Sequence, residues 1–343
     1  MKKFIIKALF YFIPFICVYS GYKIIHEYYI SGDIGKLGQI PFGKSYNKNL
    51  KQNYLTEKLV KDTLIVSYEK FLPSKTLKIF TIGDSFSQLS IFGYQNYLAH
   101  ILADSITNIK SEIFWQSLET SIALLNSGII DSANCQILIL QKVDRSVISS
   151  LCNIDFELLY ELPQNNENQK NKNVDNSAEL YNLFSWIRLQ FGYDSPIFRH
   201  NLKQDCFTHS YFSHKLYRYI DDFNFKQTKP EDIEKAKENL ILLNKKFAEK
   251  GIKMIFLIAS DKYDVYRPFM TDDSLPIDTT TDGLSSLPDV CVINTKPILQ
   301  EMVRNGEKDV YMVNDTHWSY KASEAVAEEI ARKIELLGIL KKN

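Results

Sequence analysis

Short apolar runs recur along the chain, and segments with helical spacing separate them. The run 135–143 (CQILILQKV) is apolar almost throughout, which is typical of a strand buried on both faces of a sheet. Five strands are expected, at 76–83, 110–115, 135–143, 252–260 and 289–294. Helices are expected at 92–106, 117–128, 230–251 and 319–338. This alternation predicts an α/β fold: a three-layer sandwich around a five-stranded parallel sheet with right-handed crossovers.

The common order for five such strands is the flavodoxin-like 2-1-3-4-5, which places the first and third strands side by side. Ligands of such sheets bind beyond the carboxyl ends of the strands, where the order reverses. The tripeptide Gly83-Asp84-Ser85 follows the first expected strand, and Asp315 and His317 follow the fifth. We therefore expect these side chains to meet at one rim of the sheet.

Three further segments surround this core. Residues 1–25 carry lysines ahead of an apolar run, which predicts an N-terminal transmembrane helix with the body of the protein outside the cytoplasm. The alternative is a signal peptide cleaved near residue 20. Residues 26–75 are interpreted as a juxtamembrane lead-in, and 76–338 as the main domain. This domain holds a helical insertion at about 150–228, whose polar, low-complexity stretch is expected to be disordered.

Charge and cysteine content limit the possible partners only in part. The 41 basic and 41 acidic residues give a formal net charge of zero, so the charge balance provides no basis for binding nucleic acid. Two of the five cysteines, Cys135 and Cys291, are expected in or beside strands as small buried hydrophobes. Whether Cys152 pairs with Cys206 is left open by the sequence.

Ser85, Asp315 and His317 have the residue types of a nucleophile, an orienting acid and a base. A serine hydroxyl needs a base to take its proton, and imidazole titrates near neutral pH. Asp315 is spaced to hold the His317 ring in the required tautomer. Gly-Asp-Ser alone is usually a turn or a helix cap, and a lone Asp-x-His is usually a polar loop. Their combination at one predicted rim favours catalysis.

The stretches TIGDSFSQ (81–88) and NDTHWS (314–319) resemble the SGNH (GDSL-type) hydrolase superfamily, and more closely its alginate O-acetyltransferase-like and DHHW branch. The resemblance covers about 76–337, with weaker likenesses at 137–147, 212–223 and 258–266.

This resemblance implies Ser85 as nucleophile, His317 as base and Asp315 as orienting acid, with no cofactor. It also implies transfer of acetyl groups to an exported polysaccharide, with a membrane-bound acyltransferase as the acetyl donor. In the alginate enzymes the Asp-His block precedes the serine block, whereas here the serine comes first, which weakens alginate as the substrate.

The oxyanion hole departs from the pattern of the superfamily, which usually supplies a glycine and an asparagine. At the corresponding places this chain has Gln116 and Gln141. We interpret both, with the backbone N–H of Ser85, as candidate donors to an oxyanion; a structural role is the alternative for each glutamine.

Three residues near the predicted rim are candidates for substrate binding. Arg145 could instead form a buried pair with Asp144, Lys262 could be a solvated loop residue, and Trp318 could pack under the loop. No metal is expected, because His209 and His214 lack a suitably spaced third ligand.

These observations predict a membrane-anchored, extracytoplasmic serine O-acetyltransferase that acts on a cell-envelope or exported polysaccharide. One alternative is a carbohydrate esterase with the same three residues, in which water replaces the sugar hydroxyl. The other is a non-catalytic envelope protein that binds polysaccharide on a degenerate hydrolase scaffold.

Overall fold

The computed structural model describes most of the chain outside the 43–77 and 160–195 regions. The described residues are 2–28, 30, 32–38, 40, 42, 65–67, 78–89, 92–110, 116–132, 135–159 and 196–338. The stretch 163–177, which was predicted to be disordered, lies outside these residues.

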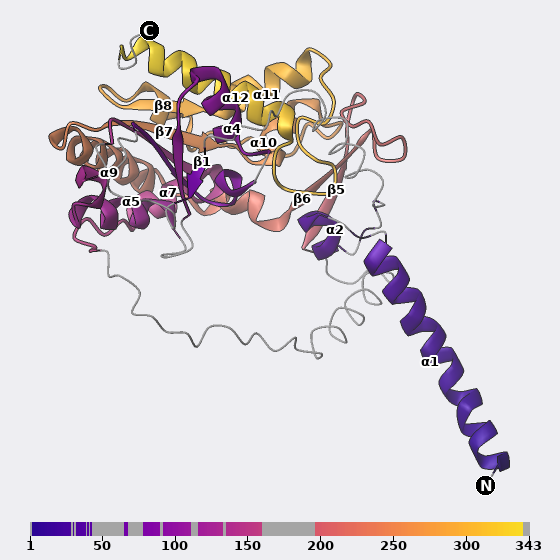
Figure 1. Cartoon of the computed structure of the whole chain (residues 1–343). Helices are drawn as coiled ribbons and strands as arrows, with labels where there is room; N and C mark the ends of the chain where they lie inside the picture. Colours follow the sequence, from indigo (N-terminus) through magenta and orange to yellow (C-terminus); the bar gives the residue numbers. More distant parts are fainter. Residues whose placement is uncertain are drawn as a thin grey trace.

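A six-stranded parallel sheet forms the centre of the molecule, in the order β1-β3-β2-β4-β7-β8 (Figure 1). Its strands are β1 Ile65–Ser67, β2 Ile79–Gly83, β3 Ile106–Lys110, β4 Ile137–Val143, β7 Lys253–Ala259 and β8 Cys291–Asn294. The observed order differs from the predicted one by the additional edge strand β1, which pairs with β3. Among themselves, the five other strands follow 2-1-3-4-5.

The second strand begins earlier in the chain than predicted. Helix α4 (Tyr94–Leu102) ends at Ala103, whose φ of 49° places it in the left-handed region that terminates helices. The strand β3 can therefore start at Ile106, whereas the sequence pattern predicted a helix up to that residue.

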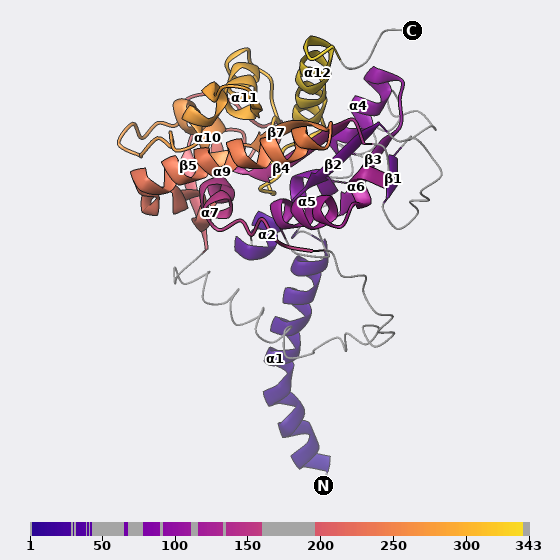
Figure 2. The same cartoon turned by 90° about the vertical axis from the view of Figure 1, so that its left-hand side faces the viewer.

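Helices cover both faces of the sheet and make a three-layer sandwich (Figure 2). The helices α4, α11 (Thr295–Arg304) and α12 (Tyr320–Leu336) share one buried core. The second core lies under α5 (Ser117–Asn126), α6 (Ile129–Ser132), α7 (Asp144–Cys152) and α9 (Pro230–Glu249). Successive β4 residues alternate between the two cores: Ile137 and Ile139 face one, Leu138 and Leu140 the other. This explains why the run is apolar throughout.

The insertion contains a β-ribbon where helix was predicted. Strand β5 (Ile197–Asn201) pairs antiparallel with β6 (Lys215–Tyr219), and the 3-10 helix η6 (Ile220–Gln227) follows. The sequence of β6 is KLYRY, and its Leu216, Tyr217 and Arg218 are all buried. Aromatic residues suit a pleated, half-buried surface, so tertiary pairing decided the structure of this stretch.

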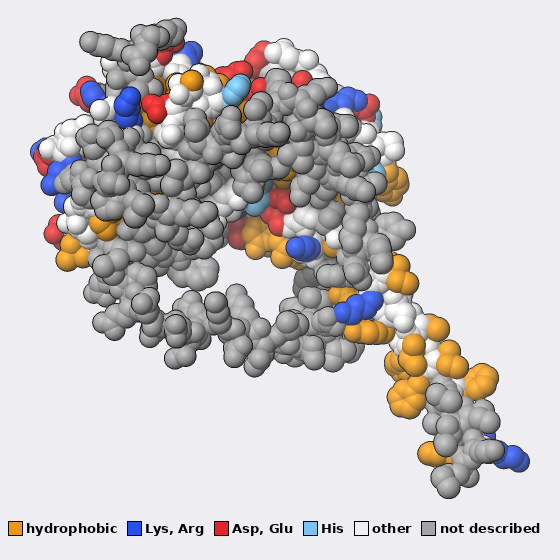
Figure 3. All heavy atoms as spheres, in the orientation of Figure 1, with side chains coloured by type: hydrophobic (Ala, Val, Ile, Leu, Met, Phe, Trp, Pro, Cys, Tyr) orange, Lys and Arg blue, Asp and Glu red, His pale blue; other side chains and the backbone are white. Residues whose placement is uncertain are grey.

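The N-terminal helix α1 (Lys2–Tyr28) projects from the body, and many of its described apolar side chains are exposed (Figures 1 and 3). Within the described residues, no helix is both long and apolar enough to cross a membrane, which corrects the prediction of a transmembrane helix. The apolar stretch between Lys7 and Lys23 is shorter than the ~20 residues that a bilayer requires, and Pro14 lies inside it. A short helix, α2 (Asp33–Gly38), then returns to the body.

Candidate active site

Ser85 is exposed at the start of the 3-10 helix η2 (Ser85–Gln88), directly after β2. The carboxylate of Asp84 fixes this turn: it accepts the backbone N–H groups of Phe86 at 3.1 Å and of Val143 at 2.7 Å. Gly83 is required here, because a Cβ would overlap Ser87 Oγ and Gln141 Oε1. The turn is therefore held against β4, and the serine hydroxyl points outward.

Ser85, His317 and Asp315 form a continuous chain of hydrogen bonds. Ser85 Oγ lies 2.7 Å from His317 Nε2, and Asp315 Oδ1 lies 2.6 Å from His317 Nδ1. Burial alone would lower the pKa of His317, but the hydrogen bond and negative charge of Asp315 outweigh it, and the pKa is raised. For Asp315, burial opposes ionisation, yet the hydrogen bond and charge of His317 lower its pKa. The pair is thus arranged to hold a proton on the imidazole.

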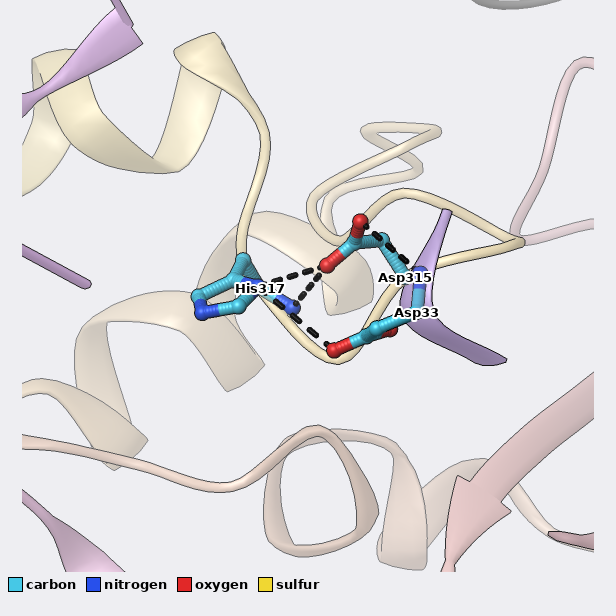
Figure 4. A group of neighbouring side chains, drawn as sticks. All are labelled: Asp33, Asp315 and His317. Atoms are coloured by element: carbon cyan, nitrogen blue, oxygen red, sulfur yellow. Dashed lines mark hydrogen bonds and ion pairs between the residues drawn. The ribbon is translucent and has the colours of Figure 1, made fainter. Parts of the chain in front are cut away.

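A second carboxylate, Asp33, lies beside this pair (Figure 4). It comes from α2, far away in the sequence, and its Oδ2 is 3.7 Å from His317 Nδ1. Thr316 donates its backbone N–H to Asp33 Oδ1 at 2.7 Å and its hydroxyl to Asp33 Oδ2. Burial, followed by the charge of Asp315, raises the pKa of Asp33. Asp33 belongs to the segment 26–75, which was interpreted as a juxtamembrane lead-in, and no motif in the sequence marks it as a site residue.

Lys262, a candidate for substrate binding, holds the loop that carries Asp315. It lies in α10 (Lys262–Tyr266), is 1% exposed, and donates to the carbonyls of Met312, Val313 and Asp315 at 2.7, 3.0 and 3.1 Å. Burial lowers its pKa to about 7 against the opposing charges of Asp33 and Asp315. Because these bonds use its three donors, Lys262 has none left for a substrate and supports the loop instead.

The two glutamines predicted for an oxyanion hole have different surroundings. Gln141 is fully buried; its Oε1 accepts from the Asp84 N–H and the Ser87 hydroxyl, and its Nε2 donates to Asp84 Oδ1. It therefore supports the serine turn. Gln116 is exposed directly before α5, and its Oε1 accepts from Lys142 Nζ at 2.6 Å. Its amide group is the more accessible of the two.

Comparison with known proteins bears on the part of the chain that supplies the acid and the base. Residues 218–342 match the family model of the SGNH hydrolase-like domain of the acetyltransferase AlgX. The resemblance recognised from the sequence is thereby confirmed. The matched region includes Asp315 and His317, whereas Ser85 lies outside it. At the family level the match supports acyl-transfer or esterase chemistry. No curated protein matches the chain.

Two other candidates for substrate binding also have internal partners. Trp318 is fully buried and packs edge-on against Phe86, with ring centroids 4.7 Å apart, so it cannot serve as a platform for a sugar. Arg145 pairs with Asp261 through its backbone N–H and its guanidinium, rather than with Asp144. Its side chain is 21% exposed and lines a cavity of about 430 Å³, so contact with a ligand there remains sterically open.

The cysteines and the possible metal ligands are the remaining candidate residues. All five cysteines are free thiols, so the Cys152–Cys206 pair that the sequence left open is not formed. Among the described residues, two groups of side chains have the spacing of metal ligands. One consists of Asp33, Asp315 and His317, whose atoms are already engaged with Thr316 and Ser85. The other is a set of three aspartates elsewhere on the rim.

Proposed function

We propose that this protein is an SGNH-type serine O-acetyltransferase that modifies a polysaccharide. One observation carries the proposal: the unbroken chain Ser85–His317–Asp315, with 2.7 Å and 2.6 Å between the successive heteroatoms. Nucleophilic acyl transfer needs these roles and this geometry. The match to an acetyltransferase domain supports the acetyl group as the cargo.

In the first half-reaction, Ser85 Oγ attacks the carbonyl carbon of the acetyl donor while His317 Nε2 takes the hydroxyl proton. Asp315 stabilises the imidazolium through its bond to Nδ1. The tetrahedral intermediate then expels the leaving group, which takes the proton back from His317. The enzyme is left with an acetyl ester on Ser85.

In the second half-reaction, a sugar hydroxyl gives its proton to His317 and attacks the acetyl carbon. Ser85 leaves as the alkoxide and recovers the proton. The backbone N–H of Ser85 and the amide of Gln116 are the proposed donors to the negative oxygen of each intermediate. No step needs a metal or a cofactor.

The esterase alternative uses the same residues with water as the acceptor. The transferase is preferred because the matched family is named for an acetyltransferase. A non-catalytic polysaccharide-binding protein is disfavoured, because a degenerate scaffold has no need for three aligned groups of this kind. An extracytoplasmic location, a polysaccharide acceptor and a membrane-bound acyltransferase as donor are predictions that accompany the proposal.

The test uses the purified chain with a nitrophenyl acetate donor and a panel of oligosaccharides. Wild type should form an acetyl-enzyme, detected by intact mass, and should transfer acetyl to a sugar faster than to water. Ser85→Ala should lose the acetyl adduct and at least about 10³-fold of the rate. The matched control is Ser286→Ala, at an exposed serine at the end of the 3-10 helix η8 (Asp282–Ser286).

Hydrolysis without transfer to any sugar would favour the esterase. An unchanged rate and adduct in Ser85→Ala would contradict both enzymatic readings.

A further inference from the structure

Three buried carboxylates lie together at the rim of the sheet, apart from the Ser85 site. Asp144 begins α7 after β4, Asp264 belongs to α10 after β7, and Asp278 precedes the 3-10 helix η8 (Asp282–Ser286). Each is at most 3% exposed. One oxygen from each carboxylate lies within 4.8 Å of the other two.

Asp264 provides the decisive observation. Within the described part of the chain, neither of its carboxylate oxygens has a hydrogen-bond partner, although the residue is 3% exposed. An unpaired buried carboxylate is strongly unfavourable, because it loses its hydration without compensation. Asp144 adds a third unpartnered oxygen, Oδ2, while its Oδ1 accepts from the Thr281 hydroxyl at 2.8 Å.

The surrounding positive charge is insufficient for this cluster. Among the residues that the structure describes, Lys296 is the cation whose charge acts on both Asp144 and Asp264, and its Nζ already donates to the backbone carbonyl of Asp278 at 2.9 Å and pairs with Asp282 Oδ1 at 2.5 Å. Arg145 is engaged by Asp261. The three carboxylates therefore share the ammonium group of Lys296 with the carboxylate of Asp282. This leaves an excess of negative charge at a buried site.

We propose that Asp144, Asp264 and Asp278 bind one divalent cation, and that this cation is Ca²⁺. The ligand atoms are all carboxylate oxygens, which hard cations prefer. Ca²⁺ is commonly held by several protein carboxylates at about 2.3–2.6 Å, whereas Mg²⁺ usually keeps several waters and takes only one or two carboxylates. The three carboxylate oxygens lie within 4.8 Å of one another, so a single Ca²⁺ can reach all of them.

The cavity beside the cluster gives the ion a route of entry. Asp144 and Thr280 both line the cavity of about 430 Å³, so one ligand lies at the boundary between solvent-filled space and the buried group. The bound ion would join the ends of β4 and β7 to the loop before η8.

The test measures ion binding by the full chain after treatment with a chelator. Calorimetry with Ca²⁺ should show one site per chain, with a Kd between about 10⁻⁶ and 10⁻³ M, and Mg²⁺ should bind at least about tenfold more weakly. The melting temperature should rise with Ca²⁺. Absence of Ca²⁺ binding by the folded wild type would overturn the proposal, as would tighter binding of Mg²⁺.

Asp264→Asn removes one ligand and one charge. It should weaken Ca²⁺ binding at least tenfold, yet melt no lower than the ion-free wild type, because repulsion within the cluster is relieved. Asp289→Asn is the control, since Asp289 is exposed and asparagine tolerates its φ of 63°.

Unchanged Ca²⁺ binding by Asp264→Asn would contradict the assignment of the site. If this variant fails to fold, Ca²⁺ binding by Asp278→Asn and by the wild type tests the assignment instead. The readout is binding, so its failure leaves the proposed acetyl transfer untouched.

Discussion

His317 faces two carboxylates rather than the single one expected from an Asp-x-His motif. Asp315 makes the 2.6 Å bond to Nδ1, and Asp33 stands 3.7 Å from the same nitrogen while it binds Thr316. Asp315 therefore orients the ring. Asp33 adds negative charge and holds Thr316, which lies between Asp315 and His317 in the sequence. Both charges raise the pKa of His317. We infer that Asp33 is a positioning residue that also sets the pH at which the base becomes neutral.

Asp33→Asn tests this role through the pH profile. The asparagine keeps an acceptor for Thr316 but loses the charge, so the pKa of His317 should fall. The base would then be neutral at lower pH, so the acidic limb of the pH profile of kcat/KM should move to lower pH. The measurement is kcat/KM for the nitrophenyl ester between about pH 5 and 9.

The loss of rate at the optimum should be about tenfold or less for Asp33→Asn, against ~10⁴-fold for Asp315→Asn. Asp289→Asn should leave the profile unchanged. If the acidic limb of kcat/KM stays in place in Asp33→Asn, or moves to higher pH, Asp33 has only a packing role.

At the scale of elements, the sequence was informative where a pattern is local. The apolar run 135–143 indicated a central strand, and the strand-end positions of Ser85 and His317 indicated one rim. It was uninformative where partners are remote. The three-residue strand β1 has too few residues to show a pattern, and β6 depends on its pairing with β5. Asp33 reaches Thr316 across 283 positions, with no motif in common.

Lys262 illustrates how one element positions another, since α10 holds the 312–315 loop through it. Lys262→Met keeps much of the volume but leaves the carbonyls of Val313 and Asp315 without a donor, whereas the Met312 carbonyl keeps the N–H of Asp315. Each unsatisfied buried group costs about 1–3 kcal/mol, so the free energy of unfolding should fall by at least ~2 kcal/mol in urea denaturation.

Lys245→Met, at an exposed lysine on α9, should change the free energy of unfolding by less than ~0.5 kcal/mol. If Lys262→Met were as stable as wild type, the three bonds would contribute little to the loop.

At the scale of the whole molecule, the N-terminal segment belongs to the active site. Ile34 and Phe42 are at most 2% exposed, and the Phe42 ring packs on Phe212 and Tyr217 of the insertion. The α2 helix also donates the Gly35 N–H to the carbonyl of Asn314. The main domain predicted to begin at residue 76 would exclude these contacts and Asp33. The segment thus joins the β5–β6 ribbon to the loop that carries the base.

Gly32→Ala probes this connection without removing a polar side chain. Gly32 has a φ of 76°, and a Cβ there would overlap the backbone carbonyl of Asn314, so α2 must move away from the loop. Gly251→Ala is the matched control, because its φ is 74° and its Cβ would have open space. Both variants should lose about 1 kcal/mol from the left-handed backbone.

Only Gly32→Ala should also shift the acidic limb of kcat/KM in the direction of Asp33→Asn, because only this change withdraws the carboxylate from His317. The comparison separates general destabilisation from displacement of the segment. A shift in both variants would trace the effect to stability alone, and a shift in neither would show that Asp33 keeps its place without the close contact between Gly32 and Asn314.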